Sequence, residues 1–304
     1  MLLKNGRKIS FFKDELRNFQ DIAAQIKPSS GEIPTIKGFD IYGEVLPFNG
    51  LVGGDHIVYV DFNKRYDLNH RIQDAKQQNR WDIVEKLELN KNRAGILLAD
   101  VSGHHITDGL LGAMLHQAFL TGVQYELLYQ GEVTLNLFEI LNTRFFNSSS
   151  FSKFITLIYG EIQENGNFTF VNAGHPPPVV FSHKYDRLVD VSVDRVRHFP
   201  PIGTLPSSED IDSRLNITRL GYKKKYTVNQ INLMGNGDIL LLYTDGLTDQ
   251  CKDENHHYFP LELEKTLKEM KSRPARDIFA RIKADLLHFG KPLDDISCVI
   301  IKKL

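Results

Sequence analysis

The feature that most constrains this chain is a set of four apolar, strand-like segments that each begin or end at an aspartate. Asp55 follows two glycines in VGGDHIVYV, and Asp100 ends AGILLAD. Asp245 ends DILLLYTD, and Asp294 opens DDISCVII. A carboxylate next to an apolar strand costs free energy unless it is paired or solvated. The four residues therefore mark places where strands enter or leave a buried core.

Helices and strands are expected in blocks along the chain. Residues 11–27 space their apolar side chains by three and four residues, which predicts an amphipathic helix. The charged segment 63–92 predicts one or two helices inserted between strands, and residues 261–289 predict two more. An Asn165-Gly166 turn between two β-rich runs is typical of a hairpin. Blocks of this kind, without strict βαβ alternation, favour an α+β fold with two mainly antiparallel sheets packed face to face and helices outside.

Bulk properties exclude several classes of protein. The formal net charge of −1 gives no basic field for nucleic acid. No apolar run approaches the roughly 18–20 residues that a membrane-spanning helix needs. Two cysteines, Cys251 and Cys298, are too few for a disulfide framework or a thiolate zinc site. We therefore expect a cytoplasmic globular protein that binds neither nucleic acid nor membranes.

The four aspartates suggest metal chemistry only if they converge. Taken singly, each is equally explained as a turn or capping residue. None of the four motifs contains lysine or arginine, so a converged cluster would need cations from elsewhere. Carboxylate clusters without cysteine suit Mg²⁺ or Mn²⁺. Two such ions about 3.5–4 Å apart are a known arrangement for hydrolysing phosphoesters.

Five blocks of sequence carry a resemblance to a known family. VGGD, ADVSGH, FVNAGHPPP, GDILLLYTDG and DDIS follow one another as in bacterial PPM-type phosphatases, the protein phosphatase 2C-like enzymes similar to stage II sporulation protein E. The resemblance runs from about residue 20 to the C-terminus. It implies an αββα sandwich with a helical insertion at about 63–92. Residues 1–36 would then form an N-terminal helical arm, and residues 37–304 the phosphatase domain.

The resemblance also implies a metal site with two Mn²⁺ or Mg²⁺ ions. Asp100 would bridge both ions. Asp245 and Asp294 would complete one site, and Asp55 with the backbone carbonyl of Val101 the other. Water activated by the two ions would attack phosphoserine or phosphothreonine directly, without a phosphoenzyme intermediate.

Further residues are expected to support these ligands without binding the ions. Gly53 and Gly54 are expected to allow close backbone approach or a positive φ, with a simple turn as the alternative. Asp295 stands where members of the broader family carry Asn. His104 is expected to be structural, while the role of His105, which replaces a glycine of the family's DVSGHG motif, stays open. His175 is also expected to be structural, because Gly174 and three prolines set a turn around it.

The implied function is a metal-dependent serine/threonine protein phosphatase acting on a phosphorylated regulatory protein, such as an anti-sigma-factor antagonist. The alternatives are a catalytically silent phosphatase-like binding module and a phosphatase of small molecules. Diguanylate cyclases share GGD but follow it with an acid and Phe, whereas this chain has GGDHI. We further expect the 63–92 insertion to lie near the metal site, and the N-terminal helix to offer a surface for homodimerisation.

Overall fold

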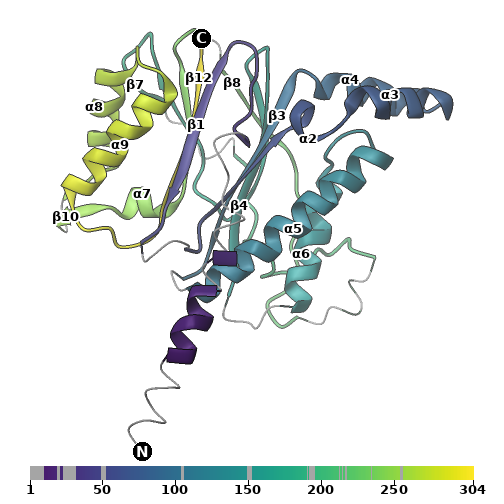
Figure 1. Cartoon of the computed structure of the whole chain (residues 1–304), viewed down its shortest axis with the longest axis horizontal. Coiled ribbons are helices and arrows are strands. Elements are labelled where there is room, and N and C mark those ends of the chain that lie inside the picture. Colours follow the sequence, from purple (N-terminus) through teal and green to yellow (C-terminus); the bar gives the residue numbers. More distant parts are fainter. Residues whose placement is uncertain are drawn as a thin grey trace, which may run out of the picture.

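The structure is a computed structural model of the chain. It describes residues 10–18, 21–22, 32–48, 53–103, 106–148, 153–189, 191, 196–211, 213, 215, 218–233, 235–253 and 256–304. Residues 10–18 are helical and project from the body of the molecule (Figure 1). Among the described helices, none combines the length and the apolar character needed to cross a membrane.

Two five-stranded antiparallel sheets form the centre of the fold (Figure 1). In spatial order, the first sheet contains β1 (Phe39–Leu46), β12 (Ile296–Lys303), β9 (Ile239–Tyr243), β6 (Val179–Ser182) and β7 (Arg187–Val189). The second contains β2 (His56–Asp61), β3 (Arg93–Val101), β4 (Ile155–Gln163), β5 (Asn167–Ala173) and β8 (Asn229–Asn232). A small hairpin pairs β10 (Cys251–Asp253) with β11 (His256–His257).

Helices cover the outer face of each sheet, which confirms the predicted α+β sandwich. The first sheet is covered by α8 (Leu261–Met270) and α9 (Ala275–Phe289), and a short α7 (Asp245–Asp249) follows β9. The second sheet is covered by α5 (Ile106–Tyr129) and α6 (Leu135–Ser148), and the insertion contains α2 (Phe62–Arg65), α3 (Leu68–Gln77) and α4 (Trp81–Asn90). The core accordingly divides into three layers: one between the sheets and one under each set of helices.

Burial on both faces explains why the central strands are continuous apolar runs. Successive side chains of a strand point to opposite faces. Along β9, Leu240 and Leu242 enter the layer between the sheets, whereas Leu241 and Tyr243 pack under α8 and α9. No face of β9 is left for water, and the hydroxyl of Tyr243 is the one polar side-chain group in the run ILLLY.

Two local predictions are confirmed in detail. The Asn165-Gly166 turn joins β4 to β5, and Gly166 adopts φ +90°, a conformation that favours glycine. Residues 261–289 form two helices, α8 and α9, as expected.

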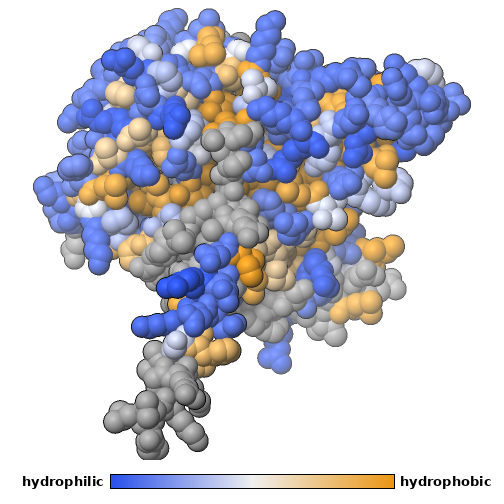
Figure 2. All heavy atoms as spheres, in the orientation of Figure 1, coloured by the Kyte–Doolittle hydropathy of each residue, from blue (hydrophilic) through white to orange (hydrophobic). Residues whose placement is uncertain are grey.

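The position expected for the 63–92 insertion is wrong. Asp55 precedes β2 and Asp100 lies at the end of β3, while the insertion joins the opposite ends of these two strands. At about 3.3 Å per residue, six to seven residues of strand separate it from the aspartates by roughly 20 Å. The surface around α3 and α4 is largely hydrophilic, which fits a solvated helical extension (Figure 2).

Candidate metal centre

The four strand-end aspartates lie at corresponding ends of the two sheets. In an antiparallel pair, the start of one strand lies beside the end of its neighbour. Asp55 directly precedes β2 and Asp100 is the penultimate residue of the neighbouring β3. Asp245 begins α7 just after β9, and Asp294 precedes the neighbouring β12. Each sheet therefore contributes two of these aspartates.

Asp100 experiences the combined charge of the other acids. Burial raises its pKa, and the negative charges of Asp245, Asp294, Asp295 and Asp108 add to this effect, bringing it to about 7. All four of these charged neighbours are carboxylates. An accumulation of negative charge in a partly buried place needs protons or cations to compensate it.

Asp55 is buried and held in one orientation. Its side chain is 5% exposed, and its Oδ2 accepts a hydrogen bond from Thr244 Oγ1 at 2.7 Å. The Thr244 hydroxyl in turn accepts from the backbone N–H of Ser297 at 2.9 Å. Burial, followed by the charge of Asp100, raises the pKa of Asp55 well above its ordinary range. Thr244 thus links a carboxylate of the second sheet to two strands of the first.

Glycines allow the segment before Asp55 to approach the end of β3. A Cβ on Gly54 would lie 2.5 Å from the carbonyl oxygen of Val101, and one on Gly53 would overlap the carboxylate of Asp295. A larger residue at position 54 would push this segment away from the Val101 carbonyl, and one at position 53 would displace the Asp295 carboxylate. The two glycines therefore serve close backbone approach, one of the roles expected for them.

Asp295 binds two backbone groups of the connection between β1 and β2. Its Oδ1 accepts from the N–H of Phe48 and its Oδ2 from the N–H of Gly54, both at 2.6 Å. Burial nevertheless raises its pKa, because these hydrogen bonds only partly offset the loss of solvent. With both oxygens engaged in this way, Asp295 fixes the loop that carries Asp55.

The remaining two aspartates are more accessible. Asp245 is exposed at the start of α7, and burial of part of its carboxylate, with the charges of Asp249 and Asp294, raises its pKa. Asp294 is half-buried, and its Oδ1 accepts from the N–H of Asp295 at 2.8 Å. These two carboxylates form the open side of the site.

The donor set suits hard divalent cations. It consists of carboxylate and carbonyl oxygens, the ligands that Mg²⁺ and Mn²⁺ prefer. Within the described residues, no three acidic, imidazole or thiol side chains already surround a single point closely enough to hold an ion. Ion binding would therefore require the carboxylates to turn inward, which an ion between them would favour by removing their mutual repulsion.

Lys153 and Asp108 are neighbours of the site that the sequence did not reveal. Lys153 Nζ donates to the carbonyl oxygen of Ser102 and pairs with Asp108 Oδ1, both at 2.8 Å. Asp108, in the first turn of α5, is only 1% exposed. The ammonium group thereby ties the turn after Asp100 to the start of α5. No spacing rule links Lys153 to Ser102, since 51 residues separate them.

The predictions for the three histidines have different outcomes. His104 and His105 lie outside the described residues, so their roles remain predictions. His175 is 2% exposed, its Nδ1 lies 2.9 Å from Thr156 Oγ1, and its backbone is bonded twice to the side chain of Asn172. Burial lowers its pKa to about 3. The predicted structural role of His175 is confirmed.

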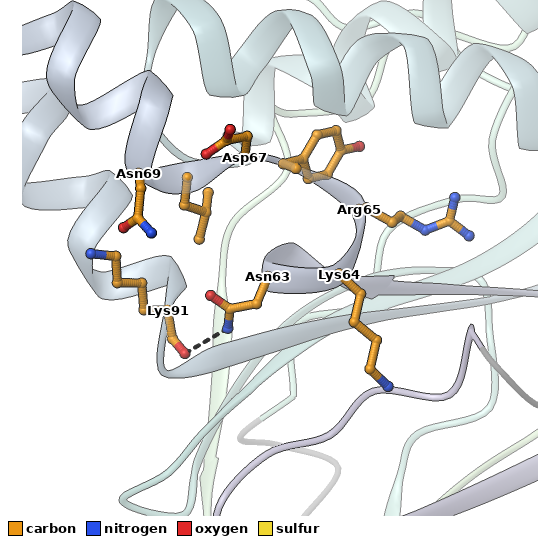
Figure 3. Close-up of a pocket in the computed structure, with 8 residues that line it drawn as sticks. Asn63, Lys64, Arg65, Asp67, Asn69 and Lys91 are labelled. Carbon is orange, nitrogen blue, oxygen red and sulfur yellow. Dashed lines mark hydrogen bonds between the residues drawn. The ribbon is translucent and has the colours of Figure 1, made fainter.

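A polar pocket in the insertion is a separate feature (Figure 3). Its floor is marked by the hydrogen bond from Asn63 Nδ2 to the carbonyl of Lys91. Lys64 and Arg65 point away from it and bond instead to Thr35 and Glu32. The pocket therefore directs neither of these cations inward, and it lies at the end of β2 opposite to Asp55.

A known protein family and its relatives match most of this chain. Residues 90–303 match the family described as stage II sporulation protein E (SpoIIE). The phosphoserine phosphatase RsbP of Bacillus subtilis (strain 168) is 28% identical over 217 residues, which cover 70% of this chain and 46% of RsbP. The chain thus spans less than half the length of that relative.

Solved structures share the fold. The PP2C domain of SiaA from Pseudomonas aeruginosa matches with a TM-score of 0.64 and 14% identity, over 98% of each chain. RsbX in complex with magnesium matches with a TM-score of 0.53 and 13% identity, over 90% of this chain and 98% of RsbX. At these identities the likeness establishes the αββα architecture.

Proposed function

The chain belongs to the family of stage II sporulation protein E (SpoIIE), and from this premise we propose that it is a metal-dependent phosphatase of phosphoserine or phosphothreonine in proteins. One observation carries the proposal: aspartates from four separate strand ends act on one another electrostatically. Burial and the charges of Asp245 and Asp294 raise the pKa of Asp100 to about 7, and Asp100 in turn raises the pKa of Asp55. A purely structural set of turn residues has no reason to concentrate negative charge in this way.

In the proposed site, two Mn²⁺ or Mg²⁺ ions would be held by carboxylate and carbonyl oxygens, with Asp100 serving both. Asp245 and Asp294 would serve one ion, and Asp55 with the Val101 carbonyl the other. The oxygen-only donor set supports this assignment. The magnesium complex of RsbX, which has the same fold, is consistent with the choice of metal.

The chain's own residues would orient the ligands of this site. When bound, the two ions supply an activated water and neutralise charge on the phosphoryl oxygens. Thr244 keeps one carboxylate oxygen of Asp55 in place, and Asp295 fixes the loop before it. Lys153 holds the turn that follows Val101. Asp245 and Asp294, on the open side, leave an approach for the phosphoester.

For the substrate, we infer a phosphorylated regulatory protein of the anti-sigma-factor antagonist type. The relationship to RsbP, itself named a phosphoserine phosphatase, supports the amino-acid class. The accessible position of Asp245 supports a macromolecular substrate, because a phosphoserine on a protein surface can reach an open site.

The test is hydrolysis of p-nitrophenyl phosphate and of a phosphoserine peptide, each with Mn²⁺, with Mg²⁺ and with EDTA. Wild type is compared with Asp100→Ala and with Asp82→Ala, a matched control on the exposed side of α4. We expect metal-dependent turnover that Asp100→Ala abolishes and Asp82→Ala leaves unchanged.

Other outcomes separate the alternatives. Turnover of p-nitrophenyl phosphate without turnover of any phosphoprotein would favour a phosphatase of small molecules. Absence of turnover by a folded protein that binds Mn²⁺ in calorimetry would indicate an enzyme that needs an activating partner. Absence of both turnover and metal binding would favour a silent binding module.

We also propose that residues 1–36 form an arm and that its helix mediates homodimerisation. The described helical residues 10–18 include Phe11 and Phe12, whose exposed fractions are 60% and 67%. Hydrophobic residues are visible on this projecting segment in Figure 2. Light scattering of wild type and Phe12→Asp would test the idea: a dimer that becomes a monomer supports it, and a wild-type monomer contradicts it.

A further inference from the structure

A second cavity lies on the outer face of the second sheet, at the end opposite to the aspartates. It has a volume of about 520 Å³ and is bounded by the start of β3, the end of β4, part of β5 and the first turn of α6. Arg93, which opens β3, lines it. Seven residues of strand separate Arg93 from Asp100, or about 23 Å. The cavity is therefore distinct from the proposed catalytic site.

Three buried polar side chains line this cavity together. Arg93 and Glu161 are 9% and 7% exposed, and Arg93 Nη1 donates to Glu161 Oε2 at 2.9 Å. Tyr159, also buried, donates from its hydroxyl to Glu161 Oε1 at 2.8 Å. Glu161 therefore has both oxygens occupied, and its charge balances that of Arg93.

The guanidinium of Arg93 has donors to spare. It carries five N–H groups, and among the described residues Glu161 is the sole acceptor for them. Its Nε is enclosed without any hydrogen-bond partner in that same part of the chain. Leaving a buried donor unpaired is unfavourable. Because Nε is enclosed, a molecule in the cavity would reach the spare N–H groups on the terminal nitrogens of Arg93, and an acceptor placed there would gain a hydrogen bond.

The remaining walls are mainly apolar. Val133 and Phe138 contribute from the α6 side, and Val171 from the outer face of β5. Small-molecule sites typically combine such walls with a few fixed polar groups. The 14-residue helix α6 also begins at the cavity, and its N-terminus favours a negatively polarised atom.

We propose that this cavity binds a small, mainly apolar molecule with a single carbonyl or carboxylate group, whose oxygen accepts a hydrogen bond from Arg93. A phosphate ester is disfavoured, because its two negative charges would meet Glu161 and also Glu132 at the rim. The molecule is consequently a ligand of a different chemical class from the phosphoprotein substrate.

The test uses phenylacetamide and phenylacetate as probes, with ethylbenzene as the matched molecule that lacks the acceptor. The Nε–Hε signal of Arg93 is followed by ¹⁵N NMR on the full chain and is assigned by its loss in Arg93→Lys. For ligands of this size we expect saturable movement of the signal with a Kd on the order of 1–10 mM. Movement with phenylacetamide alone would identify a neutral carbonyl, and movement with phenylacetate would identify a carboxylate.

Two variants control for position. Val133→Trp fills the cavity without changing the polar group, and it should abolish the response. Leu261→Trp, at a residue that is 76% exposed on α8 beneath the other sheet, should leave it intact. The proposal is overturned if neither acceptor probe moves the signal, if the movement does not saturate, if ethylbenzene moves it equally, or if Val133→Trp still responds. None of these readouts depends on phosphatase activity.

Discussion

Replacing Asp100 by asparagine is expected to stabilise the protein when no metal is present, although it removes the central proposed ligand. The reason is the pKa of this carboxyl, which burial and four neighbouring acids raise from 3.8 to about 7. At a pH between these two pKa values, Asp100 is protonated in the folded protein and ionised in the unfolded chain. Stability without metal therefore falls as the pH rises from about 4 to about 7, and then stays low.

The size of the effect follows from the shift. At pH 8, a carboxyl with these two pKa values destabilises the fold by at most about 4 kcal/mol, at 1.36 kcal/mol per pKa unit. Solvent screening at the partly exposed carboxylate reduces this to about 2 kcal/mol. For a chain of 304 residues, that corresponds to an increase in Tm of roughly 3 °C.

The assay is thermal unfolding of wild type and Asp100→Asn at pH 5 and pH 8, in EDTA and in Mn²⁺. In EDTA at pH 8 the variant should unfold at the higher temperature, and at pH 5 the difference should shrink, because wild-type Asp100 is then protonated. In Mn²⁺ the order should reverse, since metal binding stabilises only the chain that holds the ion. A variant that is less stable than wild type in EDTA at pH 8 would refute the charge argument.

Three further changes test other contacts. Thr244→Val removes the hydrogen bond to Asp55 and should weaken Mn²⁺ binding by about 10-fold, measured by calorimetry; unchanged affinity would show that Thr244 does not orient this ligand. Lys153→Met frees the turn after Asp100 and should raise the Mn²⁺ concentration needed for half-maximal activity, with partial rescue in Lys153→Arg; equal values in all three proteins would contradict this role. Lys223→Met removes the ammonium group that pairs with the buried carboxylate of Glu139. The free energy of unfolding measured in urea should fall by about 3 kcal/mol, and a fall below about 1 kcal/mol would mean that this ion pair contributes little to stability.

The sequence by itself determined the fold class and where the candidate ligands lie along the chain. Apolar runs that end at aspartate are local signals, because a buried strand requires consecutive apolar residues and its end tolerates a charged one. The Asn165-Gly166 turn is local in the same sense, since the φ of Gly166 depends on glycine's own freedom. The structural role of His175 also followed from its immediate neighbours.

The position of the 63–92 insertion depends on the directions of the neighbouring strands as well as on their order. A connection between antiparallel strands lies at the end where one stops and the next starts, so it cannot lie beside residues at the other end. Asp55 stands before its strand and the insertion after it. The two are therefore neighbours in sequence and distant in space.

Only the tertiary structure decided which side chains meet at the site. The hydrogen bond from Thr244 to Asp55 joins residues 189 positions apart, and that from Gly54 to Asp295 joins residues 241 apart. Such contacts depend on how the two sheets are stacked, and no local pattern of residues records that stacking. The raised pKa of Asp100 has the same origin, because it arises from burial and from charges brought together by separate strands.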